Sequence, residues 1–173
     1  MSEEGYRTYT NELRQQQQLL DEAKLADKLV ADGDTIDAFL AKEGIEAITS
    51  ESGLRYLITE EGNGPNAEPG DEVVVHYAGR ILNGDYFDTS IEAVAKENGM
   101  YNPSRNYSEG FSFNIGQGRV IKGWDEGIAY IKEGGKGTLY IPSPLGYGSR
   151  GSGPKIPPYS ILVFDVEVLK VNK

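Results

Sequence analysis

The chain has 173 residues, 38% of them hydrophobic, which suits one ordinary domain with a packed core and an appendage. Its 17 basic and 27 acidic residues give a net charge of -10, which disfavours nucleic acid and anionic membrane surfaces as partners because both are negatively charged. There is no cysteine and no run of about 18 apolar residues, so disulfides, thiolate chemistry and a transmembrane segment are all excluded from this sequence.

A change of composition near Ser50 divides the chain. All 8 prolines and 19 of the 22 glycines lie after residue 50, and residues 1–50 are acidic and rich in glutamine. Gly and Pro punctuate turns between strands, whereas their scarcity favours helix. We therefore predict a helical N-terminal arm over residues 1–50 and a folded domain over residues 51–173.

Two helices are predicted within the arm. Residues 11–31 contain nothing that opposes a helix, and their apolar residues recur at helical spacing as one stripe. The stripe consists of Leu19, Ala23, Ala26 and Val30. Residues 32–34 (DGD) are expected to end this helix, and a second helix over residues 35–42 is expected to close at Gly44. Such a pair can pack on the domain as a solvated arm, form a dimer contact, or be disordered.

The hydrophobic period changes from 3.6 to 2 after Ser50, which indicates strands. We expect strands over residues 54–59 and 72–82, followed by a hairpin turn at Asn83-Gly84 that returns the chain through residues 86–88. The pattern then stops between residues 89 and 110, apart from one possible helical turn over residues 91–97. A loop of this length between strands is more often functional or mobile than idle.

A short helix lies at the centre of the predicted domain. Residues 111–115 alternate as a strand, two glycines interrupt it, and the only tryptophan then begins a helical pattern of Trp124, Ile128 and Ile131. A helix this short does not persist alone, so its apolar face must be covered by the surrounding strands. Two further strands follow over residues 137–142 and 161–171, separated by a loop rich in Gly, Pro and Ser. The expected fold is α+β: a curled antiparallel sheet of about five strands wrapped on one short helix, preceded by the helical arm.

Most cofactor and metal chemistry finds no support in the sequence. His76 is the only histidine, and it sits inside an aliphatic strand, where a structural role is the usual one. There is no phosphate-binding loop, and residues 116–118 (GQG) lack the strand and helix context of a dinucleotide site. We predict no cofactor and no metal ion.

Aromatic residues are instead concentrated in the predicted sheet, the central helix and the last loop. Each could be a core residue, but together with Asp88 they indicate a concave apolar site with few polar groups. They are Tyr77, Phe87, Phe111, Phe113, Trp124, Tyr147 and Phe164.

Six segments occur in the order typical of one family. They are residues 75–79 (VHYAG), 87–90 (FDTS), 120–127 (VIKGWDEG), 147–148 (YG), 156–158 (IPP) and 162–169 (LVFDVEVL). Over residues 51–173 the chain resembles the FKBP family of peptidyl-prolyl cis/trans isomerases. That family's fold, a curled antiparallel sheet over a short helix, agrees with the pattern above.

The resemblance implies a proline pocket with Trp124 as its floor. The backbone N–H of Ile121 and the hydroxyl of Tyr147 match positions that bind carbonyl groups, and Asp88 matches a carboxylate at the pocket edge, with Arg105 as its expected partner. Asp88, Tyr147 and Ile121 are therefore the catalytic candidates. The implied lining is Tyr77, Phe87, Phe111, Val120, Ile121, Trp124, Tyr147, Ile156 and Phe164. For each residue the alternative is plain core packing.

The resemblance also implies a function, namely a rotamase that assists protein folding and acts on proline-containing peptides or unfolded proteins. The alternative is an FKBP-like binding module or holdase chaperone with little turnover, and an aromatic-rich sugar-binding domain is a third possibility. Macrolide inhibitors are possible ligands. Family members with a helical N-terminal extension are often dimeric folding helpers of the bacterial cell envelope, and residues 1–50 resemble a shortened form of such an arm, so a homodimer is a possible assembly.

Overall fold

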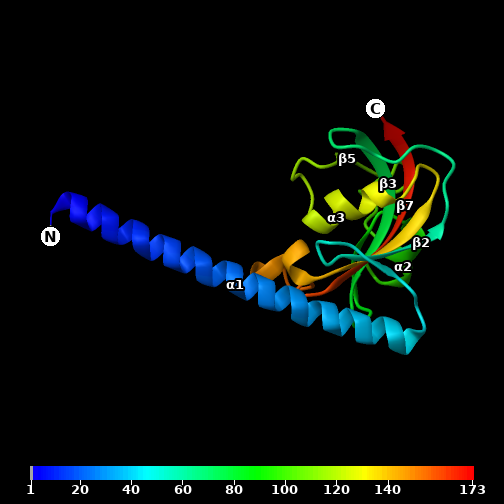
Figure 1. Ribbon diagram of the computed structural model, residues 1–173. Coiled ribbons are helices and arrows are strands. Elements are labelled where there is room, and N and C mark those ends of the chain that lie inside the picture. Colours follow the sequence, from blue (N-terminus) through cyan, green and yellow to red (C-terminus); the bar gives the residue numbers. More distant parts are fainter. Residues whose placement is uncertain (1) are drawn as a thin grey trace.

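The computed structural model describes residues 2–173 as one long helix and a domain built on a curled sheet (Figure 1). The helix α1 (Glu3–Glu43) extends well beyond the domain at its N-terminal end. The sheet is entirely antiparallel, and a short helix, α3, covers its concave face. The predicted fold class, α+β with a helical arm, is confirmed.

Seven strands form this sheet. Their order is β1-β2-β6-β7-β3-β4, with β5 pairing on β3 beside β4. The strands are β1 (Ile48–Thr49), β2 (Arg55–Glu60), β3 (Glu72–Ile81), β4 (Tyr86–Thr89), β5 (Phe111–Asn114), β6 (Lys136–Ile141) and β7 (Leu162–Asn172). The expected segments correspond to β2 through β7, and the two-residue β1, which has no periodic signal, is the strand that the sequence did not predict; it pairs on β2.

The remaining helical elements are short. The α-helices are α2 (Glu92–Glu97) and α3 (Lys122–Gly127), and the 3-10 helices are η1 (Ile128–Tyr130), η2 (Ser143–Leu145) and η3 (Gly148–Arg150). The helical turn expected in the long loop is α2. The last two 3-10 helices lie in the connection between β6 and β7, which had been expected to be a loop.

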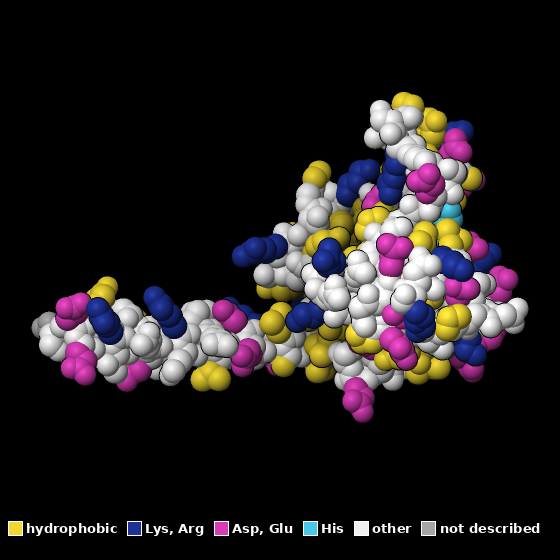
Figure 2. Space-filling view, turned by 90° about the horizontal axis from the view of Figure 1, so that it is seen from above, with side chains coloured by type: hydrophobic (Ala, Val, Ile, Leu, Met, Phe, Trp, Pro, Cys, Tyr) yellow, Lys and Arg dark blue, Asp and Glu magenta, His cyan; other side chains and the backbone are white. Residues whose placement is uncertain are grey.

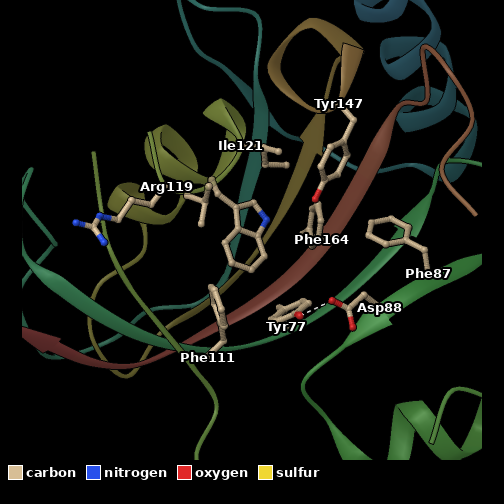
Figure 3. A pocket seen from close by; sticks show the side chains of 10 residues that line it. Tyr77, Phe87, Asp88, Phe111, Arg119, Ile121, Tyr147 and Phe164 are labelled. Atoms are coloured by element: carbon tan, nitrogen blue, oxygen red, sulfur yellow. Dashed lines mark hydrogen bonds between the residues drawn. The ribbon is translucent and has the colours of Figure 1, made fainter. Parts of the chain in front are cut away.

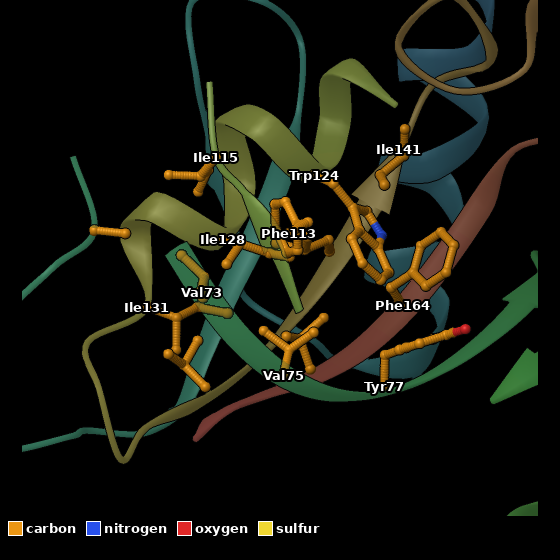
Figure 4. Packing of buried hydrophobic residues seen from close by; sticks show 14 of the residues in the cluster. Val73, Val75, Tyr77, Phe113, Ile115, Trp124, Ile128, Ile131, Ile141 and Phe164 are labelled. Atoms are coloured by element: carbon orange, nitrogen blue, oxygen red, sulfur yellow. The ribbon is translucent and has the colours of Figure 1, made fainter. Parts of the chain in front are cut away.

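The main core lies between α3 and the concave face of the sheet (Figure 4). Trp124, Ile128 and Ile131 are at most 5% exposed, as their spacing predicted, and they pack over Val73 and Val75 of β3. Alternate residues of a strand share one face, so β3 sends these valines inward while its neighbours face the other side.

Close contact between α3 and β6 requires glycine on the helix. A Cβ atom built on Gly123 would lie 2.7 Å from Ile141 Cγ2, and one on Gly127 would lie 2.8 Å from Leu139 Cδ1. Side chains at these positions would push the helix away from the sheet. The two glycines therefore allow α3 to sit low enough for Trp124 to reach the sheet.

The arm differs from the sequence prediction in one respect: α1 runs without a break through residues 32–34. The prediction of two helices was therefore wrong. The residues that suggest a helix end are instead its contact with the domain, because Asp32 and Gly33 are buried there. A Cβ atom on Gly33 would lie 2.9 Å from Arg55 Nη2, so this glycine makes room for a guanidinium group that also binds both carboxylate oxygens of Asp37 at 2.9 Å. Packing overrides local propensity here.

The C-terminal end of α1 agrees with the prediction. Gly44 adopts a left-handed conformation, with φ of 68°, and the N–H of Ile45 donates to the carbonyl of Leu40 at 2.9 Å. Both features are typical of a glycine-terminated helix. Ile36 and Leu40 are buried in a second small core with Tyr140 and Val163. The last third of α1 is thus packed on the domain, on the opposite side of the sheet from α3.

The projecting part of α1 is exposed. Leu19 and Val30 of the predicted stripe are each 65% exposed, so this stripe packs on nothing within residues 2–173. Figure 2 shows hydrophobic side chains scattered along the arm among charged ones of both signs. The structure also contains, among these residues, no helix with the length and apolar character needed to cross a membrane.

Candidate active site

A hollow of about 290 Å³ opens on the concave side of the sheet next to α3 (Figure 3). Its walls come from seven different parts of the fold: β3, β4, β5, the loop before α3, α3 itself, the connection between β6 and β7, and β7. The lining residues are Tyr77, Phe87, Asp88, Phe111, Arg119, Val120, Ile121, Trp124, Tyr147 and Phe164. The site is therefore assembled by the whole sheet rather than by one local motif.

The structure brings together nearly all residues that the sequence singled out. Ile156 is the exception, since it lines a neighbouring hollow of about 390 Å³ that shares Phe87, Asp88 and Tyr147 with the first. Phe113, one of the clustered aromatic residues, is 6% exposed and packs against Trp124 without lining the hollow. Arg119 was not predicted, although its place directly before Val120 could have suggested it.

Trp124 forms the floor of the hollow. The indole is only 5% exposed, and its ring centroid lies 5.0 Å from that of Tyr77 and 5.2 Å from that of Phe164, both edge to face. Such geometry is favourable between aromatic rings and fixes their orientation. The indole Nε1 is buried without a hydrogen-bond partner among residues 2–173. The floor is thus closely packed and largely apolar, and the hollow lies above it.

Asp88 holds one edge of the hollow through a network of hydrogen bonds. Its Oδ2 accepts from the Tyr77 hydroxyl at 2.5 Å, and its Oδ1 accepts from Thr89 N–H at 2.8 Å and from Arg105 Nη1 at 2.9 Å. Arg105 Nη2 also donates to the Tyr77 hydroxyl at 3.1 Å. The expected pairing of Arg105 with Asp88 is therefore present, and the loop over residues 89–110 serves to bring this arginine to the site.

Burial and this network shift two pKa values. Burial raises the pKa of Tyr77 well above its ordinary value, and its hydrogen bond to Asp88 raises it further. Desolvation acts to lower the pKa of Arg105, but hydrogen bonds to Asp88 and Tyr77 outweigh it and raise that pKa. Both shifts favour the protonated forms, so the hydroxyl and the guanidinium remain donors at neutral pH.

Two residues that line the hollow, Ile121 and Tyr147, carry hydrogen-bond donors, and the hydroxyl of Tyr147 points into the hollow (Figure 3). Within residues 2–173 neither the N–H of Ile121 nor the hydroxyl of Tyr147 has an acceptor. Burial raises the pKa of Tyr147, with a further contribution from the charge of Asp88, so the phenol stays protonated. Unpaired donors beside an apolar hollow can bind the carbonyl groups of a ligand.

His76 lies away from this hollow. Its Nδ1 is 2.9 Å from Ser90 Oγ, which in turn accepts from the N–H of Tyr77 at 2.8 Å. This arrangement tethers β3 to the end of β4. Among residues 2–173 no three His, Asp or Glu side chains lie close enough together to hold a metal ion.

The site is an aromatic hollow with a few hydrogen-bond donors and one carboxylate held by hydrogen bonds. It lies in a curled antiparallel sheet over a short helix, and this combination defines the FKBP-like class of prolyl isomerase domains. Sequence comparison agrees with this class. Residues 64–169 match a family model described as "FKBP-type peptidyl-prolyl cis-trans isomerase".

Individual relatives point the same way. A probable FKBP-type peptidyl-prolyl cis-trans isomerase of Haemophilus influenzae is 40% identical over 148 residues, which are 86% of this chain and 54% of that protein. An FK506-binding protein of Neisseria meningitidis is 45% identical over 112 residues, which are 65% of this chain and 90% of that protein. The chain spans only about half the length of the Haemophilus protein.

A solved structure extends the similarity to the arm. The crystal structure of FkpA from Escherichia coli superposes with a TM-score of 0.63 at 33% sequence identity, covering 99% of this chain and 74% of that one. The chain therefore belongs to the FKBP-type peptidyl-prolyl cis-trans isomerase family.

Proposed function

We propose that this chain catalyses rotation about X-Pro peptide bonds in polypeptides and thereby assists their folding. The observation that carries the proposal is the hollow above Trp124, which offers aromatic walls for a pyrrolidine ring and donors for the flanking carbonyls. The family membership supports the same activity.

The chemistry requires no covalent step. Rotation about a peptide bond meets a barrier of about 18–20 kcal/mol, while an X-Pro bond prefers trans by only about 0.5–1 kcal/mol. The barrier arises from resonance, which places negative charge on the amide oxygen and positive character on the nitrogen. A twisted amide loses most of this polarity, so an apolar surrounding stabilises the twisted form relative to the planar one.

Hydrogen bonds then select the twisted geometry. The N–H of Ile121 and the hydroxyl of Tyr147 bind the carbonyls on either side of the proline, while Phe87, Trp124 and Phe164 grip its ring. The Asp88 network keeps the ring of Tyr77 in place as one wall. Catalysis in this scheme depends on shape and polarity alone.

A peptide assay with a competitor tests the proposal. Cis-to-trans conversion of a proline tetrapeptide takes about 10–100 s at 25 °C without a catalyst. Micromolar protein should make this conversion much faster. Because a relative is named an FK506-binding protein, we expect the macrolide FK506 to compete for the hollow and abolish the acceleration. Conversion no faster than in buffer would refute the isomerase proposal.

A binding module or holdase without turnover is distinguishable from this. Phe87→Ala removes one wall of the hollow and should slow isomerisation. A holdase that acts through other surfaces would give a different pair of results. The wild type would show no peptide turnover, and the Phe87→Ala protein would suppress aggregation of an unfolded protein as well as the wild type does.

The arm is proposed to form a homodimer. Several of its exposed apolar residues follow heptad spacing, as expected for two helices that pack together. They are Tyr6, Tyr9, Leu13 and Leu20, between 46% and 61% exposed. Sedimentation should therefore give a dimer for the wild type and a monomer for Leu13→Glu combined with Leu20→Glu. A wild-type monomer at tens of micromolar would contradict this assembly.

A further inference from the structure

Two residues at the site, Tyr147 and Ile156, belong to the connection between β6 and β7, over residues 142–161. This connection contains two short 3-10 helices but no strand longer than a single bridge, between Ser152 and Ile156. Its position depends on side-chain packing, with Ile156 buried in the main core, and on contacts at its two ends. The contacts at both of its ends lead to α1 (Figure 1).

At the entrance to the connection, Asp32 of α1 binds Ser143. Its Oδ2 accepts from Ser143 N–H at 2.8 Å and from Ser143 Oγ at 2.5 Å. The Asp32 residue is 3% exposed and Ser143 is fully buried. Burying a carboxylate is costly unless its hydrogen bonds are replaced, and here the two bonds to Ser143 and an ion pair with Lys28 at 3.2 Å replace them. Ser143 begins the 3-10 helix that leads directly to Tyr147.

At the exit, Lys28 of the same helix lies over Tyr159. The Lys28 Nζ is 5.2 Å from the centroid of the phenol ring, a cation-π contact. Tyr159 has a φ of 59°, a conformation rare for residues other than glycine, so its surroundings must hold it there. Its N–H also donates to the carbonyl of Gly148 at 2.8 Å, immediately after Tyr147.

We infer that Asp32, supported by Lys28, is a positioning residue for the isomerase site and acts through Tyr147. Lys28 and Asp32, at positions i and i+4 of α1, contact the two ends of the connection that carries the Tyr147 phenol. This part of α1 therefore belongs to the isomerase domain as well as to the arm. This inference rests on the proposed function, because its readout is isomerase turnover. Asp32 is a buried carboxylate that lines neither hollow at the site.

Asp32→Ala tests the inference, with Asp34→Ala as the matched control on the same helix, since Asp34 is exposed. We expect Asp32→Ala to lower kcat/KM for a proline peptide by at least about threefold, because misplacing a group that orients the substrate slows the reaction, and Asp34→Ala to leave it unchanged. Ser143→Ala removes only the hydroxyl donor and should produce a smaller loss in the same direction. It also serves as the test if Asp32→Ala does not fold.

A double-mutant cycle separates positioning from general stability. In a Tyr147→Phe background, which lacks the phenolic donor, Asp32→Ala or Ser143→Ala should change kcat/KM by less than about twofold, because groups that act through one another are not additive. Amide hydrogen exchange should rise at Leu145 and Gly146, whose N–H groups bond within the connection, and stay unchanged at Ser90, bonded to Tyr77.

Three results would overturn the inference. The first is an unchanged kcat/KM in both Asp32→Ala and Ser143→Ala. The second is an equal loss of kcat/KM in the presence and absence of the Tyr147 hydroxyl. The third is amide hydrogen exchange that rises at Ser90 as much as at Leu145. Failure of the proposed function itself looks different, since the wild-type protein would then give no turnover at all.

Discussion

Replacement of Asp88 by valine tests the network at the edge of the hollow, and its cost can be worked out from the structure. The Tyr77 hydroxyl belongs to a residue that is 6% exposed and would lose its acceptor, which costs about 1–3 kcal/mol for a buried donor. The ion pair of Asp88 with Arg105 joins side chains that are 45% and 36% exposed, so solvent screening limits it to about 0.2–1 kcal/mol. The free energy of unfolding should therefore fall by about 2 kcal/mol.

Thermal and urea unfolding would measure this loss. For a chain of this length, about 2 kcal/mol lowers Tm by about 4–8 °C. In a Tyr77→Phe background the unsatisfied hydroxyl is absent, so Asp88→Val should cost less, because only the ion pair with Arg105 and the hydrogen bond from Thr89 N–H are then lost. Peptide turnover should also fall by roughly tenfold in Asp88→Val, because the wall formed by Tyr77 is no longer fixed.

Additive effects of the two substitutions would contradict a stabilising hydrogen bond between Tyr77 and Asp88. If Asp88→Val cost the same free energy with tyrosine as with phenylalanine at position 77, the short hydrogen bond between the two side chains would contribute nothing to stability. A Tm equal to that of the wild type would refute the whole network.

Three further predictions concern the same hollow. Tyr147→Phe should lower kcat/KM by about three- to tenfold through loss of one carbonyl-binding donor, with the far-UV circular dichroism spectrum and Tm unchanged. Gly79→Ala should lower the free energy of unfolding, measured with urea, by about 1–3 kcal/mol and should narrow the hollow. The added Cβ would lie 2.6 Å from Phe164 and 2.8 Å from Phe87, so an unchanged free energy of unfolding would contradict this packing. The raised pKa of Tyr77 means that the native state holds its proton more tightly than the unfolded chain. The contribution of Tyr77 to the free energy of unfolding should therefore be fully present below about pH 10 and be lost as pH rises above it, so the wild type should lose more stability in this range than Tyr77→Phe.

The alternating strands and the short helix could be predicted from sequence because one face of each is buried. Val73 and Val75 on β3 and the Trp124, Ile128, Ile131 series are buried as their periods indicate. The two-residue β1 gave no such signal, since a segment this short has no period.

The arm shows where sequence patterns mislead. Residues 32–34 have the composition of a helix end, yet the helix continues because Asp32 binds Ser143 and Gly33 lies against Arg55. Those partners come from distant parts of the chain, so no local pattern could reveal them. The same limit applies to Arg105: the resemblance to a family suggested it as the partner of Asp88, but only the folded loop determines its distance.

A nuclear magnetic resonance measurement on a proline peptide with substoichiometric wild-type protein would show whether the hollow above Trp124 binds and isomerises proline. It would report the cis/trans exchange rate together with contacts from the proline ring. We predict accelerated exchange, with ring protons of the proline close to the indole of Trp124. No acceleration, or acceleration with the proline ring remote from Trp124, would contradict the account.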